Sequence, residues 1–182
     1  MLRAVVIASL FAACSRDELD TCPVVAPGEL VVTEVQGDGD PLNGSWIELF
    51  NASGGSIDLE GARIRFRRKD GSSEVPVLVR RPLTVNAGEY IVLGKYLDTD
   101  RPAHVDYGFV EDFEDAWLSA AAIDLENCGL RIDLAQYDAL PEIGTFSLGT
   151  DPPTADANDL ATAWCTNATP AGTPGAANPV CP

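Results

Sequence analysis

The amino-acid sequence predicts an all-β domain that is stabilised by disulfide bonds. From Glu29 onward, short runs of Val, Ile, Leu and aromatic residues alternate with turns rich in Gly, Asp, Asn and Ser, a pattern typical of all-β folds. The chain has five cysteines, and cysteines of proteins in oxidising compartments usually pair. Its 182 residues suit one domain with a substantial core.

The predicted strands follow one another at short intervals along the chain. Val75–Val79 is expected to return from Ala62–Arg67 as a hairpin, and Pro76 places it at a sheet edge because proline has no N–H to donate. The full set is Glu29–Val35, Ser45–Phe50, Ile57–Leu59, Ala62–Arg67, Val75–Val79, Tyr90–Leu93, His104–Val110, Leu130–Leu134, Ile143–Leu148 and Ala161–Cys165.

Two segments are expected to lie outside the sheets. Asp115–Ile123 contains several alanines and is interpreted as an irregular connection with one helical turn. Residues 151–182 are rich in Pro, Ala and Thr and are expected to be coil held by cysteines. Ser45–Phe50, by contrast, has apolar residues on both alternating faces, so we expect it to be a central strand.

The first 28 residues have the pattern of an export signal and a tether. Residues 1–13 combine a basic start with a short apolar run that ends in small residues, which is typical of a signal peptide. Cys14 follows directly, as in the lipobox of bacterial lipoproteins, so the sequence predicts lipidation at Cys14 and a tether over residues 14–28. The protein is then an extracytoplasmic lipoprotein of the cell envelope, anchored in the outer membrane; the alternative is plain secretion.

The other four cysteines predict two disulfides. Four cysteines allow three connectivities, of which we favour Cys165 with Cys181 and Cys22 with Cys128. The first pair closes a short loop, and the second ties the N-terminal segment to the domain. Zinc binding is disfavoured because the chain has no Cys-x-x-Cys pair and a single histidine.

Composition and motifs argue against two functional classes. The formal net charge of −16 disfavours nucleic acid as a partner. The sequence has no Gly-x-Ser-x-Gly, His-Glu-x-x-His or Walker motif, and a histidine-based catalytic system would have to use His104. We therefore expect no enzymatic activity.

A loop with two aspartates is the only candidate for a metal site in the sequence. Asp38 and Asp40 lie in a Gly-Asp-Gly-Asp turn, and carboxylates bind calcium. The spacing does not match an EF-hand, so the alternatives are a calcium site of another kind and a solvated turn. Apart from this calcium, no cofactor is expected.

A cluster of basic residues is the strongest functional lead. The cluster holds seven of the twelve basic residues: Arg63, Arg65, Arg67, Arg68, Lys69, Arg80 and Arg81. Strand alternation places Arg63, Arg65 and Arg67 on one face, with Arg80 and Arg81 at the end of the returning strand. Arginine binds phosphate and carboxylate groups with paired hydrogen bonds, so one interpretation is docking to an anionic envelope polysaccharide or an acidic protein partner. The other is that these arginines pair with carboxylates of the same chain or protect an edge strand.

Several motifs, in order, resemble those of the lamin tail domain. They cover residues 29–178, most of the chain after the predicted signal. They are Leu-Val-Val-Thr-Glu-Val at 30–35, Trp-Ile-Glu-Leu-Phe-Asn at 46–51, Ile-Asp-Leu-Glu-Gly at 57–61, Ala-Gly-Glu-Tyr-Ile-Val-Leu at 87–93, Leu-Glu-Asn-Cys-Gly-Leu-Arg-Ile at 125–132 and Thr-Pro-Gly-Ala-Ala-Asn at 173–178.

The resemblance implies an immunoglobulin-like β-sandwich over residues 29–182. Members of that family usually act as attachment or interaction modules. The sequence thus predicts a non-enzymatic envelope lipoprotein that docks anionic polymers or a protein partner. The alternative is a calcium-dependent or carbohydrate-binding module, because one fold can host many functions.

Overall fold

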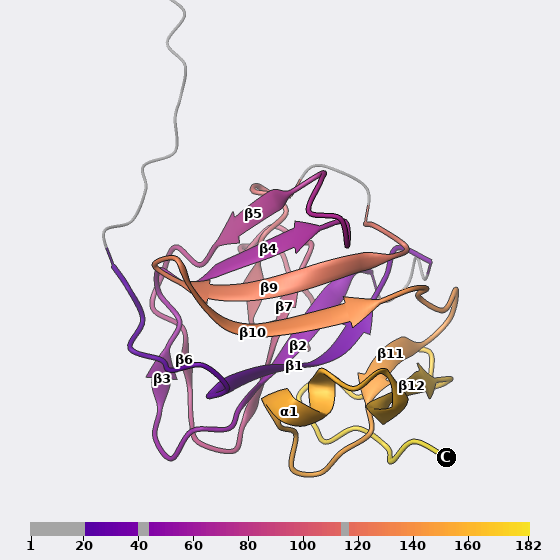
Figure 1. Cartoon of the computed structure of the whole chain (residues 1–182). Helices are drawn as coiled ribbons and strands as arrows, with labels where there is room; N and C mark the ends of the chain where they lie inside the picture. The colour runs from indigo at the N-terminus through magenta and orange to yellow at the C-terminus, as the bar shows by residue number, and fades with distance from the viewer. Residues whose placement is uncertain (1–20, 40–43, 114–116) are drawn as a thin grey trace, which may run out of the picture.

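The protein is a disulfide-stabilised β-sandwich, seen here in a computed structural model that describes residues 21–39, 44–113 and 117–182. Two larger sheets pack face to face, with a small two-stranded sheet at one end (Figure 1). The strands are β1 (Leu30–Gln36), β2 (Trp46–Asn51), β3 (Ile57–Asp58), β4 (Arg63–Arg67), β5 (Val75–Leu78), β6 (Thr84–Val85), β7 (Tyr90–Gly94), β8 (Tyr107–Gly108), β9 (Ala121–Asn127), β10 (Leu130–Tyr137), β11 (Thr145–Leu148) and β12 (Trp164–Asn167).

The six-stranded sheet has the order β12-β11-β1-β2-β7-β8, and the four-stranded sheet has the order β10-β9-β4-β5. Neighbouring strands are antiparallel except β7 and β8. β2 lies inside its sheet with both faces buried, as its sequence predicts: Ile47 belongs to the main core, whereas Trp46 packs with Val92 and Val105 on the outer face. β5 is an edge strand, as Pro76 predicts.

The strand β9 is the main departure from the sequence prediction. The expected irregular connection over Asp115–Ile123 is wrong from residue 121 onward, because Ala121–Asn127 is a strand between β4 and β10. Ala121, Ala122 and Ile123 are almost fully buried. Small side chains fit a strand that is covered on both sides, so tertiary packing overrides their low strand propensity.

The C-terminal part contains more regular structure than predicted. α1 (Ala155–Asn158) is a single turn that begins at Thr154, whose hydroxyl accepts a hydrogen bond from the Ala157 N–H. Residues Ala161–Ala163 form a 3₁₀ turn, so β12 starts three residues later than the predicted strand. The strand expected over His104–Val110 is reduced to β8.

Both expected disulfides are present with the favoured pairing. Cys22 is bonded to Cys128 across 106 residues, and Cys165 to Cys181 across 16 residues. Val25 is buried in the core and the Gly28 N–H donates to the Ile132 carbonyl, so packing onto the domain starts before the expected boundary at residue 29. Structural disulfides indicate an extracytoplasmic location.

No helix in the described ranges is long and apolar enough to cross a membrane. The predicted lipidation site Cys14 lies outside the described residues, as does Asp40.

Candidate functional site

The arginines of β4 lie opposite carboxylates on the neighbouring strand β9. In the β4–β9 register Arg63 faces Glu126 and Arg65 faces Asp124. The side chain of Arg65 donates to Glu126 Oε1 at 2.6 Å and also to Glu74, and these hydrogen bonds raise the pKa of its guanidinium.

Arg67 is held in the same way by Asp124. Its Nε and Nη2 both donate to this nearly buried carboxylate, with Nη2 3.2 Å from Oδ1. This hydrogen bonding raises the pKa of Arg67. The outer face of the four-stranded sheet is therefore an ion-pair network, which we call the arginine face.

Arg80 and Arg81 also have partners within the chain. Arg80 Nη2 lies 3.2 Å from Asp112 Oδ1. Arg81 donates from Nε to Asp98 Oδ2 at 2.7 Å and from Nη2 to the Asp106 carbonyl. The hydrogen bond with Arg81 is the main cause that holds the pKa of Asp98 below its ordinary value.

Arg65, Arg67, Arg80 and Arg81 therefore pair with the protein's own carboxylates. This is the alternative interpretation of the sequence. For Arg65 and Arg67 the physical reason is the strand β9, which places Asp124 and Glu126 beside β4; Arg80 and Arg81 instead meet Asp112 and Asp98 in loops. Sequence reasoning missed the pairing because it missed the strand.

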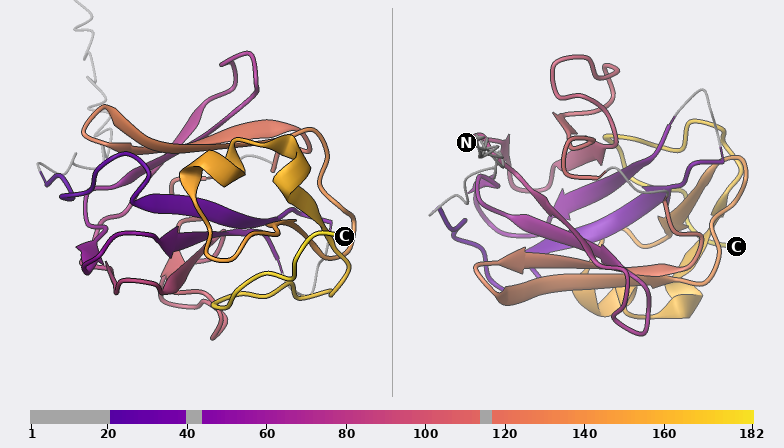
Figure 2. Two further views of the ribbon diagram at one scale, coloured as in Figure 1. Left: turned by 60° about the horizontal axis from the view of Figure 1, so that its bottom comes forward. Right: turned by 90° about the horizontal axis from the view of Figure 1, so that it is seen from above.

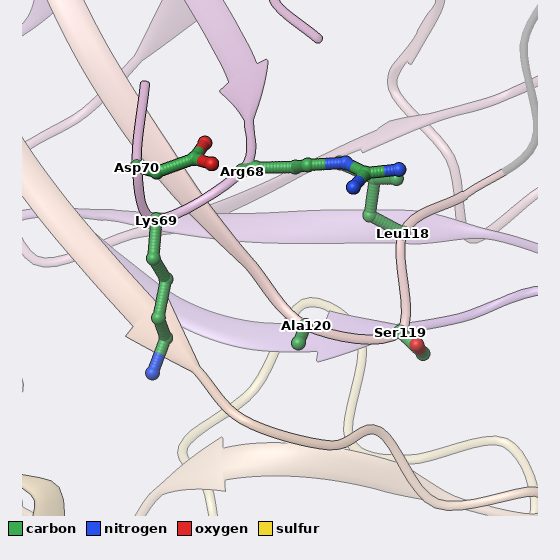
Figure 3. Close-up of a pocket in the computed structure, with 6 residues that line it drawn as sticks. All are labelled: Arg68, Lys69, Asp70, Leu118, Ser119 and Ala120. Carbon is green, nitrogen blue, oxygen red and sulfur yellow. The ribbon is translucent and has the colours of Figure 1, made fainter. Parts of the chain in front are cut away.

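A cavity lined by two basic side chains lies beside the turn between β4 and β5. It has a volume of about 490 Å³ and opens to solvent (Figure 3). It lies between this turn and the segment that leads into β9. Its lining residues are Arg68, Lys69, Asp70, Leu118, Ser119 and Ala120.

Arg68 is the distinctive side chain of this cavity. It is exposed, and its guanidinium makes no hydrogen bond or ion pair with the described residues. Figure 3 shows it extending toward Leu118, while Lys69 leaves the turn in another direction. Arg68 thus differs from Arg65 and Arg67 on the adjoining strand, whose charges are already compensated.

The turn itself orients these side chains. The Arg68 N–H donates to the Ser72 carbonyl, and the Gly71 N–H donates back to the Arg68 carbonyl. The Asp70 carboxylate accepts hydrogen bonds from the hydroxyl and N–H of Ser72, which lower its pKa. Asp70 is therefore engaged within the turn, and the cavity keeps a cationic group available for an anion.

A second cluster consists of two buried carboxylates, and it has a structural role. Glu34 and Glu48 face each other across β1 and β2, and both are fully buried. Glu34 accepts from Thr145, Ser147 and Thr173, and Glu48 accepts from the Gly175 N–H at 2.7 Å. We call Glu34 and Glu48 the carboxylate pair and residues 172–178 the C-terminal strap.

The strap crosses the outer face of the six-stranded sheet, away from the four-stranded sheet (Figure 2). Asn178 secures its far end by donating to the Thr33 carbonyl at 2.9 Å. Three segments that carry the family resemblance, residues 30–35, 46–51 and 173–178, therefore meet at the carboxylate pair. In this structure, residues of these segments hold the strap on the sheet through hydrogen bonds.

Burial makes both members of the carboxylate pair weaker acids than ordinary glutamates. Burial raises the pKa of Glu48 to about 8, with a further contribution from the charge of Glu34, while hydrogen bonds from Thr33, Gly175 and Ala176 oppose the shift. Burial also raises the pKa of Glu34 against the opposing hydrogen bonds from Thr145, Ser147 and Thr173. Raised carboxyl pKa values often mark catalytic acids, but here both groups are covered by the strap.

Asp38 is used to hold loops together. Its Oδ1 accepts from the Ser45 hydroxyl, and its Oδ2 accepts from the Trp117 N–H at 2.8 Å. Both oxygens that the calcium interpretation requires are therefore engaged within the protein. No group of three or more His, Cys, Asp or Glu side chains in the described ranges is arranged to hold a metal ion.

His104 is half-buried beside the ring of Trp46, with ring centroids 6.4 Å apart. Burial lowers its pKa, so the imidazole is neutral at physiological pH.

When the chain is compared with known proteins, no family model matches it and no curated sequence is similar enough to count as a relative.

Proposed function

We propose that the protein is a non-enzymatic cell-envelope lipoprotein whose β-sandwich acts as an attachment module for anionic groups of an envelope polymer. The observation that carries the proposal is the open cavity beside Arg68. The exposed Arg68 guanidinium makes no hydrogen bond with a carboxylate among the described residues, although, after the hydrogen bonds from Ser72, its charge also lowers the pKa of Asp70, and it provides donors for a carboxylate or phosphate group. The anionic partner is the one expected from the sequence, but it docks at Arg68 and Lys69.

The location and anchoring of the module belong to the same proposal. The disulfides support an extracytoplasmic location, and the signal-like residues 1–13 support export. Lipidation at Cys14 would hold the protein in the outer membrane, since a cysteine with more than one acyl chain anchors stably. A cavity on a tethered domain can then reach polymers of the same envelope.

The resemblance to the lamin tail domain supports an attachment role, with an immunoglobulin-like topology as part of the proposal. A non-enzymatic role is supported by the use of the chemically unusual groups: the carboxylate pair holds the strap, and His104 packs against Trp46. The alternative function of a carbohydrate-binding module is compatible with the same cavity. The alternative of a calcium-dependent module receives no support from Asp38, because both of its carboxylate oxygens accept hydrogen bonds within the protein.

Binding of the purified protein to an acidic envelope polysaccharide tests the proposal. Arg68→Ser should weaken binding about tenfold, the effect of losing a charge-assisted hydrogen bond, and raising the salt concentration should weaken binding of the unaltered protein. Arg63→Ser is the matched control, because it removes the same charge from the adjoining strand outside the cavity. Equal losses in the two variants, or none in Arg68→Ser, would refute the proposed site.

A further inference from the structure

A second cavity adjoins the cavity beside Arg68. It has a volume of about 240 Å³ and lies between β10 and the turns α1 and 161–163. Lys69 lines both cavities, so they meet at this side chain. The other lining residues of the second cavity are Leu134, Gln136, Asp138, Asn158, Asp159, Ala161 and Trp164.

The second cavity has a different chemistry from the first. Its one cation, Lys69, donates to Asp138 Oδ1 at 2.5 Å, so its charge is compensated on this side. Gln136, Asp138 and Asp159 offer amide and carboxylate oxygens that accept hydrogen bonds. Such a lining disfavours an anion and suits a neutral group that is rich in hydroxyl donors.

The floor of the second cavity is rigid. The ring of Trp164 stacks on Phe146, with centroids 5.0 Å apart and an angle of 10° between the planes. Its indole N–H donates to the Asn158 carbonyl at 2.8 Å. Asn158 in turn donates to Asp133 Oδ2 at 2.6 Å. Asn158 and Trp164 are mostly buried, so they form a fixed support beneath the exposed Gln136, which limits the entropy lost on binding.

We propose that the ligand of the two cavities is a linear acidic polysaccharide in which anionic and neutral sugars alternate. The anionic sugar lies at Arg68, and the neutral sugar lies at Gln136 and Trp164, with Lys69 between them. This inference rests on the proposed function and adds the class of polymer to it. A membrane surface with anionic headgroups would engage the cavity beside Arg68 but not the second cavity.

Titration calorimetry with defined oligosaccharides tests the inference. The probes are hyaluronan oligosaccharides, in which a uronate alternates with a neutral sugar, oligogalacturonate, in which every sugar is anionic, and dextran, which is neutral. Hyaluronan fragments should bind most tightly. Arg68→Ser should weaken their binding about tenfold, and Gln136→Ala about fivefold. Both positions are exposed, so the variants should fold, and Arg63→Ser should bind as the unaltered protein does.

The outcomes separate the inference from the proposed function. If Gln136→Ala leaves hyaluronan binding unchanged while Arg68→Ser weakens binding of every anionic probe, the second cavity is not a sugar site and only the anion site stands. Equal affinity for oligogalacturonate and hyaluronan would lead to the same conclusion. If Arg68→Ser changes nothing, the proposed function fails and the inference fails with it.

Discussion

The arginine face and the carboxylate pair both carry charged residues, but the protein stabilises them in opposite ways. On the arginine face, Arg65 meets carboxylates of opposite charge near solvent, and Arg67 meets the nearly buried Asp124. Under the strap, Glu34 and Glu48 are buried beside each other, and they accept hydrogen bonds from uncharged hydroxyl and N–H donors. The region with the most charged residues is therefore not necessarily the region whose charged residues contribute most to stability.

The energetic consequences differ accordingly. Exposed ion pairs contribute little, because water solvates the separated charges well and the side chains lose entropy when they pair. Buried polar groups that lose their partner cost far more, because water cannot replace it. Residues that are not functional sites can therefore dominate stability, and the following three experiments measure this contrast.

The largest effect is expected from Glu34→Ala. The substitution leaves donors of Thr145, Ser147 and Thr173 without their shared acceptor and should lower the free energy of unfolding by about 3 kcal/mol. Urea denaturation measures the loss. Glu34→Gln keeps one acceptor oxygen and should fall between this variant and the unaltered protein; a loss below about 1 kcal/mol for Glu34→Ala would mean that the strap does not depend on the pair.

The next effect is a loss of stability at alkaline pH. The pKa of Glu48 is raised to about 8 in the folded protein from 4.5, so the folded state binds a proton that the unfolded state has released. Stability from this group is complete below about pH 4.5 and declines as the pH rises through 8. Between pH 6.5 and 8.5 the decline should reach about 2 kcal/mol.

In that pH window the carboxylate pair is the main group expected to titrate, while the lowered pKa of His104 acts in the opposite direction near the lower edge. Burial raises the pKa of Asp133 to about 6, so its contribution is mostly lost below the window, whereas the lowered pKa of Asp98 acts only at acidic pH. Thermal unfolding at several pH values measures the slope. Glu48→Gln should flatten it, and an equally steep slope in that variant would assign the titration to another group.

The smallest effect is expected on the arginine face. Arg65→Gln removes the ion pairs with Glu74 and Glu126, yet it should cost less than about 1 kcal/mol, because Arg65 and Glu74 are about one-third exposed. Urea denaturation at low and high salt gives the value. A cost comparable to that of Glu34→Ala would overturn the contrast between the two regions.

Local pattern was enough to predict much of the fold. The alternation in residues 29–35, 45–50 and 62–67 predicted β1, β2 and β4 to within one residue at each end, because side chains of a strand point to opposite faces in turn. The all-β class and the central place of β2 follow from the same periodicity. The favoured pairing of the four cysteines is also the pairing in the structure.

The candidate site was less accessible to such reasoning. The sequence predicts a basic cluster, but Arg65, Arg67, Arg80 and Arg81 have carboxylate partners, and the cavity depends on Arg68 and Lys69. Nothing in the local pattern separates Arg67 from Arg68. The difference arises because the side chain of Arg67 donates to Asp124 on β9, whereas Arg68 belongs to the turn that follows β4.

The fold class, most strand positions and the cysteines available for pairing could be predicted from the sequence, since these depend on residues close together in the chain or on composition. The long-range packing of the strands sets which charges are compensated, where the carboxylate pair is covered and which turn presents a cation to solvent. Arg65 and Glu126 are 61 residues apart, and Glu34 and Thr173 are 139 apart. Contacts at such separations depend on how the strands pair and pack, which local periodicity does not specify.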